Sequence, residues 1–401
     1  MSTPSPRGTS HLPVAILGLI TIAVYGCWTY SFGVLLDPIV TDTGWSELGI
    51  VTAFSVSAGI AGLGSMIGGW ALDRWGSRVV FGVAAIFGTI AFWAGANAST
   101  ATGFTVLSSL GGGVFGALGF YHVTQTVAAR VGGPSPTRSI TALTVWGAFA
   151  GAIYLPLTAW LIDLVGWRDT LTIITASAGA MLAIGAVSVA TDTDPQHRIT
   201  FLSGLGKSLA VPGARWFMLA VGLAGIAISV LVVYQVPLMT AAGLTLATAS
   251  SIAGARSIAQ LLGRLPLAPI VGRLGANGAM QLSFVAIAAG CLIVIIAGSV
   301  AMGVLFAVVA GFGIGSMSPL TGINSVELFP AARLGVGRGT IAAAGSAAGA
   351  IGPLLGSGAV ALSGSRSAAA VVAAGAGFAA VWAMRLAGRH VETRVGTQAS
   401  S

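Results

Sequence analysis

Charged residues are scarce in this sequence. Asp, Glu, Lys and Arg make up 7% of its 401 residues, against about 25% in a typical soluble domain. So little charge cannot cover a soluble surface. Disorder is excluded, because disordered segments are poorly hydrophobic and highly charged, whereas 55% of this chain is hydrophobic. The 59 glycines follow no period of three, which excludes a collagen-like chain. What remains is a protein that crosses a membrane several times.

Cysteine is scarce too, and the basic residues are not gathered on one segment. Cys27 and Cys291 both lie within apolar stretches, which predicts two buried thiols rather than a disulfide framework or a metal site. The net charge of +8 comes from cations spread singly or in pairs between apolar blocks, so we expect no nucleic-acid partner. The polar N-terminus, 1–11, has no small-residue cleavage site before the first apolar block, which favours an uncleaved cytoplasmic tail.

Apolar blocks long enough to cross a bilayer are the main feature of the chain. A hydrocarbon core of about 30 Å needs roughly 20 helical residues. Twelve such blocks lie near 13–38, 46–72, 78–97, 102–129, 139–165, 168–190, 216–240, 246–272, 277–298, 301–325, 334–362 and 367–387. The sequence therefore predicts an all-α polytopic membrane protein with twelve transmembrane helices.

A polar stretch from Thr191 to Arg215 separates six of these helices from the other six. It predicts an N-terminal bundle over 1–190, a cytoplasmic linker over 191–215, and a C-terminal bundle with a short tail over 216–401. With the N-terminus inside, the inside segments carry fourteen Lys and Arg and the outside segments two. The positive-inside rule then places both termini in the cytoplasm, and we expect the inner membrane of a bacterium.

Landmarks of the first half recur in the second. Arg74 and Gly76 return 199 residues later, Arg138 after 200 and Arg168 after 198, as Arg273, Gly275, Arg338 and Arg366. This spacing predicts two pseudo-symmetric six-helix bundles. Halves related in this way place a solute site at their interface, near the middle of the membrane.

The loop after the second block reads GWALDRWGSR over 69–78. It resembles the G-x-x-x-D-R-x-G-x-R loop of the major facilitator superfamily, with Gly69, Asp73, Arg74, Gly76 and Arg78 at its fixed positions. The resemblance implies that these residues form a cytoplasmic gate. The residues also suit that role, because a carboxylate there can pair with a cation across the gap between halves, Gly76 permits a tight turn, and Gly69 permits close helix approach.

A narrower resemblance concerns the branch of the superfamily. Residues 44–46 (GWS), 166–168 (GWR) and Gly263-Arg264 are similar to the bacterial relatives of monocarboxylate transporters and oxalate–formate exchangers. This implies that Arg264 contacts a substrate carboxylate. Two departures weaken it: Gln260 stands where many monocarboxylate transporters have an acid, and helices 1 and 11 lack the lysine that the branch often carries.

Arg256 and Arg264 lie within the eighth block, where a buried arginine costs roughly 2.5–3.5 kcal/mol. On one continuous helix they would lie about 80° apart and could face one cavity. No Asp or Glu lies mid-helix, so a solute carboxylate is the natural partner. The alternative is that one arginine bonds helix carbonyls or snorkels.

Other polar residues within the blocks could line the same site. His122 is the histidine placed within a span, which makes it the candidate for proton coupling; the alternative is a hydrogen-bonded cavity histidine. The remaining candidates for substrate binding are Tyr30, Tyr121, Tyr154, Tyr234, Gln235 and Asn324, each of which could instead serve packing.

These features together predict a secondary active transporter for a small organic anion, with a monocarboxylate and proton symport favoured. The alternative is an efflux pump for drugs or metabolites, with structural arginines. We expect no enzymatic activity, no cofactor and no metal, because no metal or nucleophile cluster lies within the blocks. The expected partners are a small solute, protons and the lipid bilayer, and we expect a monomer.

Overall fold

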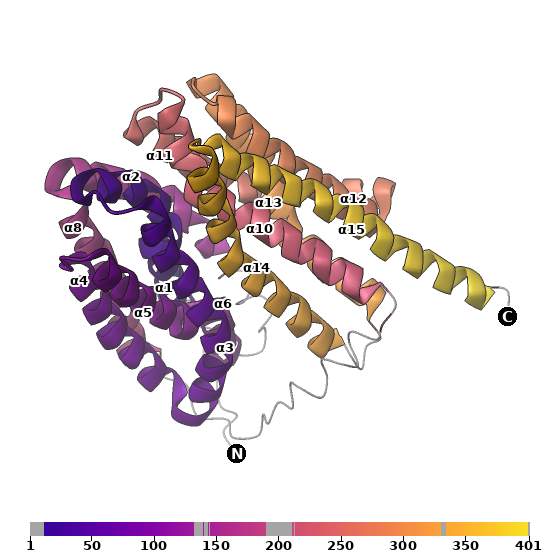
Figure 1. The fold of residues 1–401 in the computed structure, drawn as a ribbon. Coiled ribbons are helices and arrows are strands. Elements are labelled where there is room, and N and C mark those ends of the chain that lie inside the picture. Colours follow the sequence, from indigo (N-terminus) through magenta and orange to yellow (C-terminus); the bar gives the residue numbers. More distant parts are fainter. Residues whose placement is uncertain are drawn as a thin grey trace, which may run out of the picture.

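In the computed structural model, residues 12–131, 139, 143, 145–189, 211, 213–329 and 334–399 are described, and these residues contain helices and no strand. The first half comprises α1 Leu12–Val24, the π-helix η1 Tyr25–Tyr30, α2 Phe32–Thr43, α3 Glu47–Val83, the π-helix η2 Ala84–Gly88, α4 Thr89–Ala96, α5 Ala101–Gly119, α6 Tyr121–Val131 and α8 Phe149–Ser188. The second half comprises α10 Ala214–Ala241, α11 Leu246–Leu262, α12 Leu267–Ile293, the 3-10 turn η3 Val294–Ile296, α13 Val300–Leu328, α14 Leu334–Ser363 and α15 Ser367–Ala399. Figure 1 shows the halves as two bundles side by side.

Ten helical stretches in the described residues are long and apolar enough to cross a membrane. One of them, Val145–Ser188, has 44 residues, about 66 Å of helix, which is twice a bilayer core. Gly166 (φ 76°, ψ 171°) reverses the chain inside it and makes two crossings. α11, with 17 residues, is not among these ten stretches, and a short break joins it to α12. The predicted all-α fold with twelve crossings is confirmed.

The repeat is visible in the backbone itself. Glycines with positive φ pair across the halves as Gly44 with Gly243, Gly76 with Gly275, and Gly166 with Gly364, at spacings of 199, 199 and 198 residues. Helix starts pair in the same way: the side chains of Ser46 and Thr245 cap α3 and α11, and those of Thr100 and Ser299 cap α5 and α13. The chain therefore turns and caps its helices at equivalent places in both bundles.

Several crossings that the sequence predicts as continuous helices are interrupted. The first contains the π-helix η1 and the third the π-helix η2, the fourth breaks at Phe120 (ψ 177°) between α5 and α6, and the eighth breaks between α11 and α12. Pro266 explains the eighth, because it has no N–H to donate. At Phe120 the side chains fill the gap: the Phe120 ring stacks on Tyr25 with centroids 4.0 Å apart. Breaks of this kind in membrane helices are frequently found at functional sites.

The two bundles meet along α2 with α10, α3 with α14, and α8 with α11. Glycine allows the close approach: a Cβ on Gly33 would lie 2.6 Å from the Val233 carbonyl oxygen. The predicted linker lies outside the described residues apart from Val211 and the start of α10, and the tail 1–11 lies wholly outside them. The domain boundaries therefore remain a prediction.

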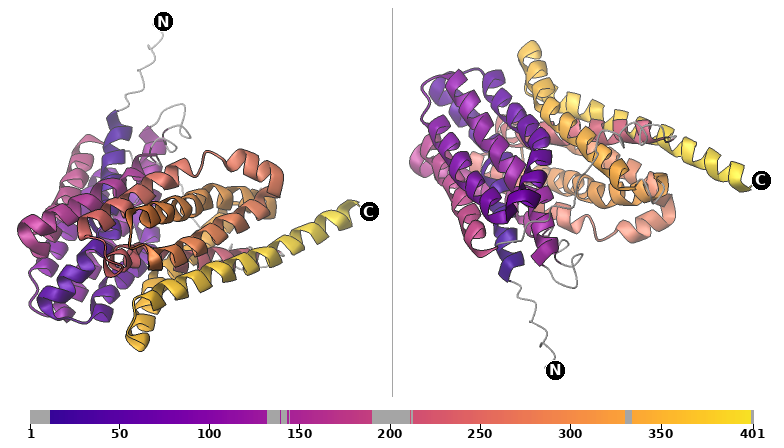
Figure 2. Two further views of the ribbon diagram at one scale, coloured as in Figure 1. Left: turned by 90° about the horizontal axis from the view of Figure 1, so that it is seen from above. Right: turned by 90° about the horizontal axis from the view of Figure 1, so that it is seen from below.

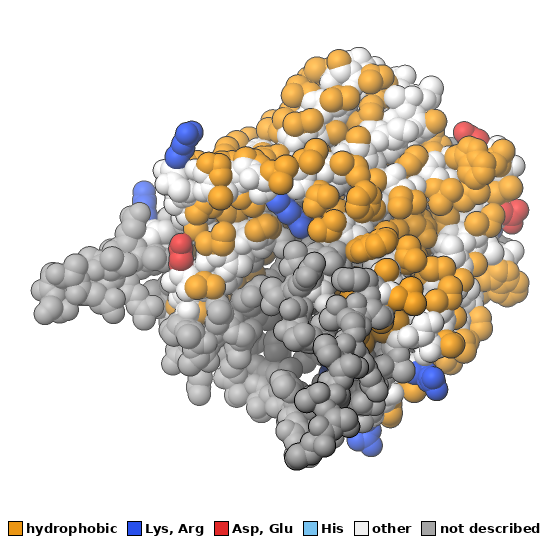
Figure 3. Space-filling model, turned by 180° about the vertical axis from the view of Figure 1, so that it is seen from behind, with side chains coloured by type: hydrophobic (Ala, Val, Ile, Leu, Met, Phe, Trp, Pro, Cys, Tyr) orange, Lys and Arg blue, Asp and Glu red, His pale blue; other side chains and the backbone are white. Residues whose placement is uncertain are grey.

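Apolar side chains cover the outside of the helices. Figure 3 shows them over one face, which carries only scattered Lys and Arg side chains. Leu63, Val187 and Leu362 are 79%, 76% and 92% exposed, as expected for a surface that faces lipid. The end of α15 extends past both bundles in the two views of Figure 2.

Candidate functional site

Arg256 is the largest fully buried side chain of the described residues, with 0% exposure. It lies on α11, and its Nε donates a hydrogen bond of 2.7 Å to Oε1 of Gln235 on α10. Its other two guanidinium nitrogens are buried and have no hydrogen-bond partner. A buried cation that lacks an anionic partner is costly, so a negatively charged or strongly accepting group next to Arg256 would lower that cost.

Two tyrosines lie near the two predicted arginines. The charges of Arg256 and Arg264 both act on the hydroxyl of Tyr30 in η1, and the charge of Arg264 also acts on that of Tyr121 in α6. We call Tyr30, Tyr121, Arg256 and Arg264 the arginine cluster. Of the residues that the sequence predicts for the site, these four and Gln235 come from four separate crossings and lie in one region of the structure.

Glycines of the fifth crossing make room for this cluster. A Cβ on Gly147 would lie 1.7 Å from the Tyr121 hydroxyl, and a Cβ on Gly151 would lie 2.1 Å from Oγ of Ser257 and 3.0 Å from Cδ1 of Tyr30. Gly151 belongs to the first half and Ser257 to the second. The arginine cluster therefore lies at the interface between the halves.

Arg264 lies in the break between α11 and α12, not within a helix. Its side chain is partly exposed, and its Nε donates to the carbonyl oxygen of Gly315 at 3.3 Å. The expectation that both arginines share one continuous helix is wrong, because Pro266 ends the helix before that register is reached. Of the two, Arg256 is buried without full partners and Arg264 bonds a carbonyl.

Two serines on α11 were missed by the sequence analysis. Ser250 and Ser257 are buried, and neither hydroxyl has a hydrogen-bond partner. They are seven residues apart, and this spacing places them on one face of a helix. Their seven-residue spacing, and the position of Ser257 directly after Arg256, could have indicated them from the sequence.

Four predicted residues lie away from the arginine cluster. Tyr154 packs its ring on Gly26 and bonds Oγ of Ser177 at 2.8 Å, all within the first half. Nε2 of His122 lies 2.7 Å from the carbonyl oxygen of Ala117, which the break at Phe120 leaves without its backbone donor. His122 therefore stabilises the break between α5 and α6.

Asn324 belongs to a separate cavity in the second half. This cavity measures about 290 Å³ and is lined by Gly275, Asn277, Glu327 and Met384 among others. The side-chain amide of Asn324 donates to the carbonyl oxygens of Ala276 and Leu320, at 3.1 and 2.9 Å. It thus supports the turn at Gly275 and does not reach the arginine cluster.

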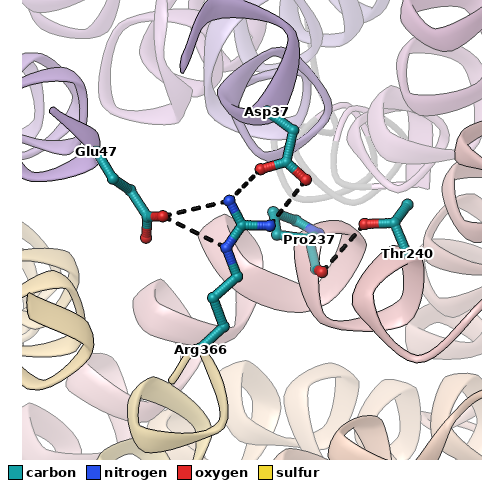
Figure 4. A network of polar contacts seen from close by, with 5 residues as sticks. All are labelled: Asp37, Glu47, Pro237, Thr240 and Arg366. Atoms are coloured by element: carbon teal, nitrogen blue, oxygen red, sulfur yellow. Dashed lines mark hydrogen bonds and ion pairs between the residues drawn. The ribbon is translucent and has the colours of Figure 1, made fainter. Parts of the chain in front are cut away.

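A charged cluster that the sequence did not predict joins the halves at the end predicted to face outside (Figure 4). Arg366, in the turn between α14 and α15, binds both carboxylate oxygens of Asp37 on α2 and contacts Oε2 of Glu47 on α3 twice, at 3.3 Å. We call Asp37, Glu47 and Arg366 the outer gate. Tyr234 is the fourth predicted residue that lies away from the arginine cluster. It interacts with Glu47 and not with Arg256. The sequence signal for this cluster was Arg366 itself, because the segments predicted to face outside carry only two cations.

The predicted cytoplasmic gate is described in part. Gly76 adopts φ 74° and ψ 172°, which confirms the tight turn, and the side chains of Arg74 and Arg78 are exposed. Gly69 has nothing within 4 Å of where its Cβ would lie, so its expected helix contact is wrong; Gly68 makes that contact instead, 2.1 Å from the Ala117 oxygen. The side chain of Asp73 lies outside what the structure describes.

Comparison with known proteins identifies the architecture. The family model of the Major Facilitator Superfamily matches residues 216–399. A point mutant of the nucleoside transporter NupG is similar to the chain with a TM-score of 0.80 at 15% identity, over 94% of this chain and 99% of that one. The chain has the major facilitator fold.

Other solved structures share that fold. A bacterial homologue of the human lysosomal transporter Spinster, in an inward-facing and unoccupied conformation, matches with a TM-score of 0.69 at 14% identity, over 96% of this chain and 97% of that one. A peptide transporter POT in complex with sulfate matches with a TM-score of 0.75 at 11% identity, over 97% of both chains. No curated protein sequence matches the chain. At these identities the likeness shows the fold alone.

Proposed function

We propose that this protein is a secondary active transporter that carries a small organic anion, with a monocarboxylate favoured, across the inner membrane by alternating access. The major facilitator fold and the family match over the second half support a transporter rather than an enzyme. The observation that carries the anion proposal is Arg256, which is 0% exposed and has two guanidinium nitrogens without a partner.

The position of Arg256 suits alternating access. The residues around it come from both halves: Tyr30 from the first half, and Gln235 and Ser257, the latter packed against Gly151 of the first half, from the second. A solute bound there would touch both bundles, so movement of one bundle against the other would change which side reaches it. With Nε occupied by Gln235, the two terminal nitrogens remain for a bidentate contact with a carboxylate.

Proton coupling is the second part of this proposal. His122 remains its candidate residue: with Nε2 donating to the Ala117 oxygen, the proton to be carried would bind Nδ1. The second candidate function is an efflux pump for drugs or metabolites. It is favoured by Arg264, whose bond to the Gly315 carbonyl is what a structural arginine would make.

The test is uptake into proteoliposomes of labelled lactate, pyruvate, acetate and oxalate, with and without an inward proton gradient. Removing one side of a buried charge pair costs about 2–5 kcal/mol, so Arg256→Ala should lower carboxylate uptake by about thirtyfold or more. The matched control is Arg385→Gln, because Nε of Arg385 also bonds a glutamine oxygen, Gln281 Oε1, but at an exposed place.

The outcomes separate the candidates. Uptake that requires Arg256 and survives in the control supports an anion carrier, and its response to the gradient decides symport against exchange. If correctly folded protein takes up none of the four carboxylates, the efflux function replaces the proposal.

A further inference from the structure

We propose that the cavity in the second half, lined by Asn324 and Glu327, binds an organic ammonium group carried on a small apolar body. We call it the second-half cavity. It lies within one bundle and apart from the arginine cluster, so the proposal does not depend on which solute the protein carries.

The second-half cavity lies among the ends of four helices. Its walls come from the start of α10, the turn at Gly275 within α12, the end of α13 and the end of α15. These ends belong to the side predicted to face the cytoplasm, because the turn at Gly275 repeats the turn at Gly76. The volume of about 290 Å³ lies at the lower end of the range for small-molecule sites, which is about 300–1,000 Å³.

Most of the lining is apolar and would hold the body of the ligand. The apolar side chains of the lining are Phe217, Leu274, Leu328, Met384 and Ala387. All of them are buried except Leu274, which is exposed. The turn leaves open space beside them, since no atom lies within 4 Å of where a Cβ on Gly275 would be.

Asn324 supplies an unused hydrogen-bond acceptor to this lining. Its side chain is 6% exposed, and its amide nitrogen donates to the carbonyl oxygens of Ala276 and Leu320. Its Oδ1 accepts no hydrogen bond from any residue that the structure describes. A buried acceptor without a donor is costly, so an N–H group of a ligand would stabilise this place.

Glu327 supplies a negative charge at the edge of the cavity. It follows Asn324 by three residues on α13, a spacing that places two side chains on one face of a helix. Its side chain is exposed and forms no ion pair or hydrogen bond with the described part of the chain. No Lys, Arg or His is among the described residues that line the cavity, so the lining itself does not neutralise this carboxylate.

The side-chain donors of the lining are already occupied. The amide of Asn277 donates to the carbonyl oxygen of Met384 at 3.1 Å and accepts a bond of 2.6 Å from Gln281. Gln281 in turn accepts from Nε of Arg385 at 3.0 Å. What the side chains leave for a ligand is a carboxylate and an amide oxygen, and both favour a positively charged donor.

An organic ammonium group fits this lining better than a metal ion does. Hard cations take six or more oxygen ligands, whereas the side chains offer one carboxylate and one free amide oxygen. In the residues that the structure describes, no group of three or more His, Cys, Asp and Glu could hold a metal ion. A primary ammonium carries three N–H donors, and its apolar body would pack on the remaining walls. A soluble amine and the headgroup of an amino lipid share this chemistry.

Protection of a cysteine inside the cavity tests the proposal at the site itself. Ala387→Cys places a thiol in the lining, in a chain with Cys27→Ala and Cys291→Ala, whose thiols are buried. The rate at which methyl methanethiosulfonate modifies the new thiol is measured in phosphatidylcholine nanodiscs, whose headgroup has no N–H donor. The two probes are phenethylamine, which is charged at neutral pH, and phenethyl alcohol, its neutral counterpart.

The proposal predicts that phenethylamine protects the thiol at a concentration about fivefold lower than phenethyl alcohol does, because an exposed carboxylate contributes about that much to a charged contact. Glu327→Gln should bring protection by the amine down to that of the alcohol. The matched control is Asp163→Asn, which removes an exposed carboxylate of the first half that does not line the cavity and should keep the preference.

A second arm of the experiment separates the two sources of the ammonium group. Once protection by the amine is seen, slower modification in phosphatidylethanolamine nanodiscs identifies the lipid headgroup as a ligand, and an unchanged rate identifies a soluble amine. Equal protection by amine and alcohol, protection by neither, or a preference that survives Glu327→Gln would overturn the proposal. If the Ala387→Cys chain does not fold, thermal unfolding of the parent with each probe makes the same comparison, and equal shifts of Tm would overturn it.

Discussion

Nε of Arg256 donates to Oε1 of Gln235 across 2.7 Å, between α11 and α10. That single bond fixes the guanidinium plane while its two terminal nitrogens stay free. Gln235 is itself 0% exposed. In the proposed function this pair is a preoriented receptor for an anion, and the solute would neutralise the charge of Arg256.

Gln235→Glu should impair anion uptake more than Gln235→Ala does. The new carboxylate would lie within bonding distance of Arg256 and would neutralise it in place of the solute. We expect the KM for a carboxylate to rise at least about tenfold, measured by initial rates of uptake.

The exposed glutamine pair supplies the control for this prediction. Gln281→Glu places the same charge beside Arg385 and should leave the KM unchanged. An equal rise in both variants would mean that added negative charge, and not its place next to Arg256, causes the effect.

Gly151→Ala should slow transport by opposing the conformation described here. Its Cβ would lie 2.1 Å from Ser257 Oγ and 3.0 Å from Ser257 Cβ and Tyr30 Cδ1, so the side chains at the interface between the halves, or α8 and α11 themselves, would have to shift. Gly349→Ala on α14 is the matched substitution, because nothing lies within 4 Å of that Cβ. Initial uptake rates compare the two, and equal rates would show that the contact at Gly151 is not restrictive.

His122→Gln should separate coupling from folding. A glutamine amide can still donate to the Ala117 oxygen that now receives Nε2, but it cannot carry a proton at neutral pH. We expect gradient-driven uptake to fall to the rate seen without a gradient, while exchange of labelled for unlabelled solute continues. Retained stimulation by the gradient would remove His122 from the mechanism and leave it as the support of the break at Phe120.

Gly275→Ala should destabilise the second bundle. Its backbone, with φ 70° and ψ 170°, lies in a region that costs a residue with a side chain about 1–3 kcal/mol. Gly272→Ala, three residues earlier, has an ordinary φ and open space around its Cβ, so it should be neutral or slightly stabilising. Thermal unfolding in detergent compares the two, and equal losses of Tm would contradict the argument.

The architecture could be predicted from the sequence because it depends on features that extend over long stretches of the chain. Block length, the inside excess of arginine and the 198–200 residue repeat act over the whole chain, and the paired glycines Gly76 and Gly275 turn as their repeat predicts. The breaks were harder to foresee. Pro266 indicated the break in the eighth crossing. The interruption at Phe120 depends instead on the ring of Tyr25, which stacks on Phe120, and on the hydrogen bond from His122 to the Ala117 carbonyl oxygen.

The site was predicted in part for the same reason. A buried arginine without an acidic partner is conspicuous in any apolar block, and this criterion found Arg256. Whether a tyrosine faces the arginine cluster or its own bundle depends on helix rotation, which the sequence does not give. Tyr30 lies near the predicted arginines, whereas Tyr154 and Tyr234 contact other groups. The outer gate required the two halves to be docked, since Arg366 lies 329 residues from Asp37 in the chain.

The central claim is that the free nitrogens of Arg256 select a negative charge. The most direct measurement compares uptake of a small labelled carboxylate with uptake of its neutral amide, in the parent protein and in Arg256→Gln. We predict that the parent prefers the carboxylate by at least about thirtyfold and that Arg256→Gln loses this preference while Arg385→Gln keeps it. A parent protein that carries both solutes equally well, or an Arg256→Gln protein that still prefers the carboxylate, would contradict the claim.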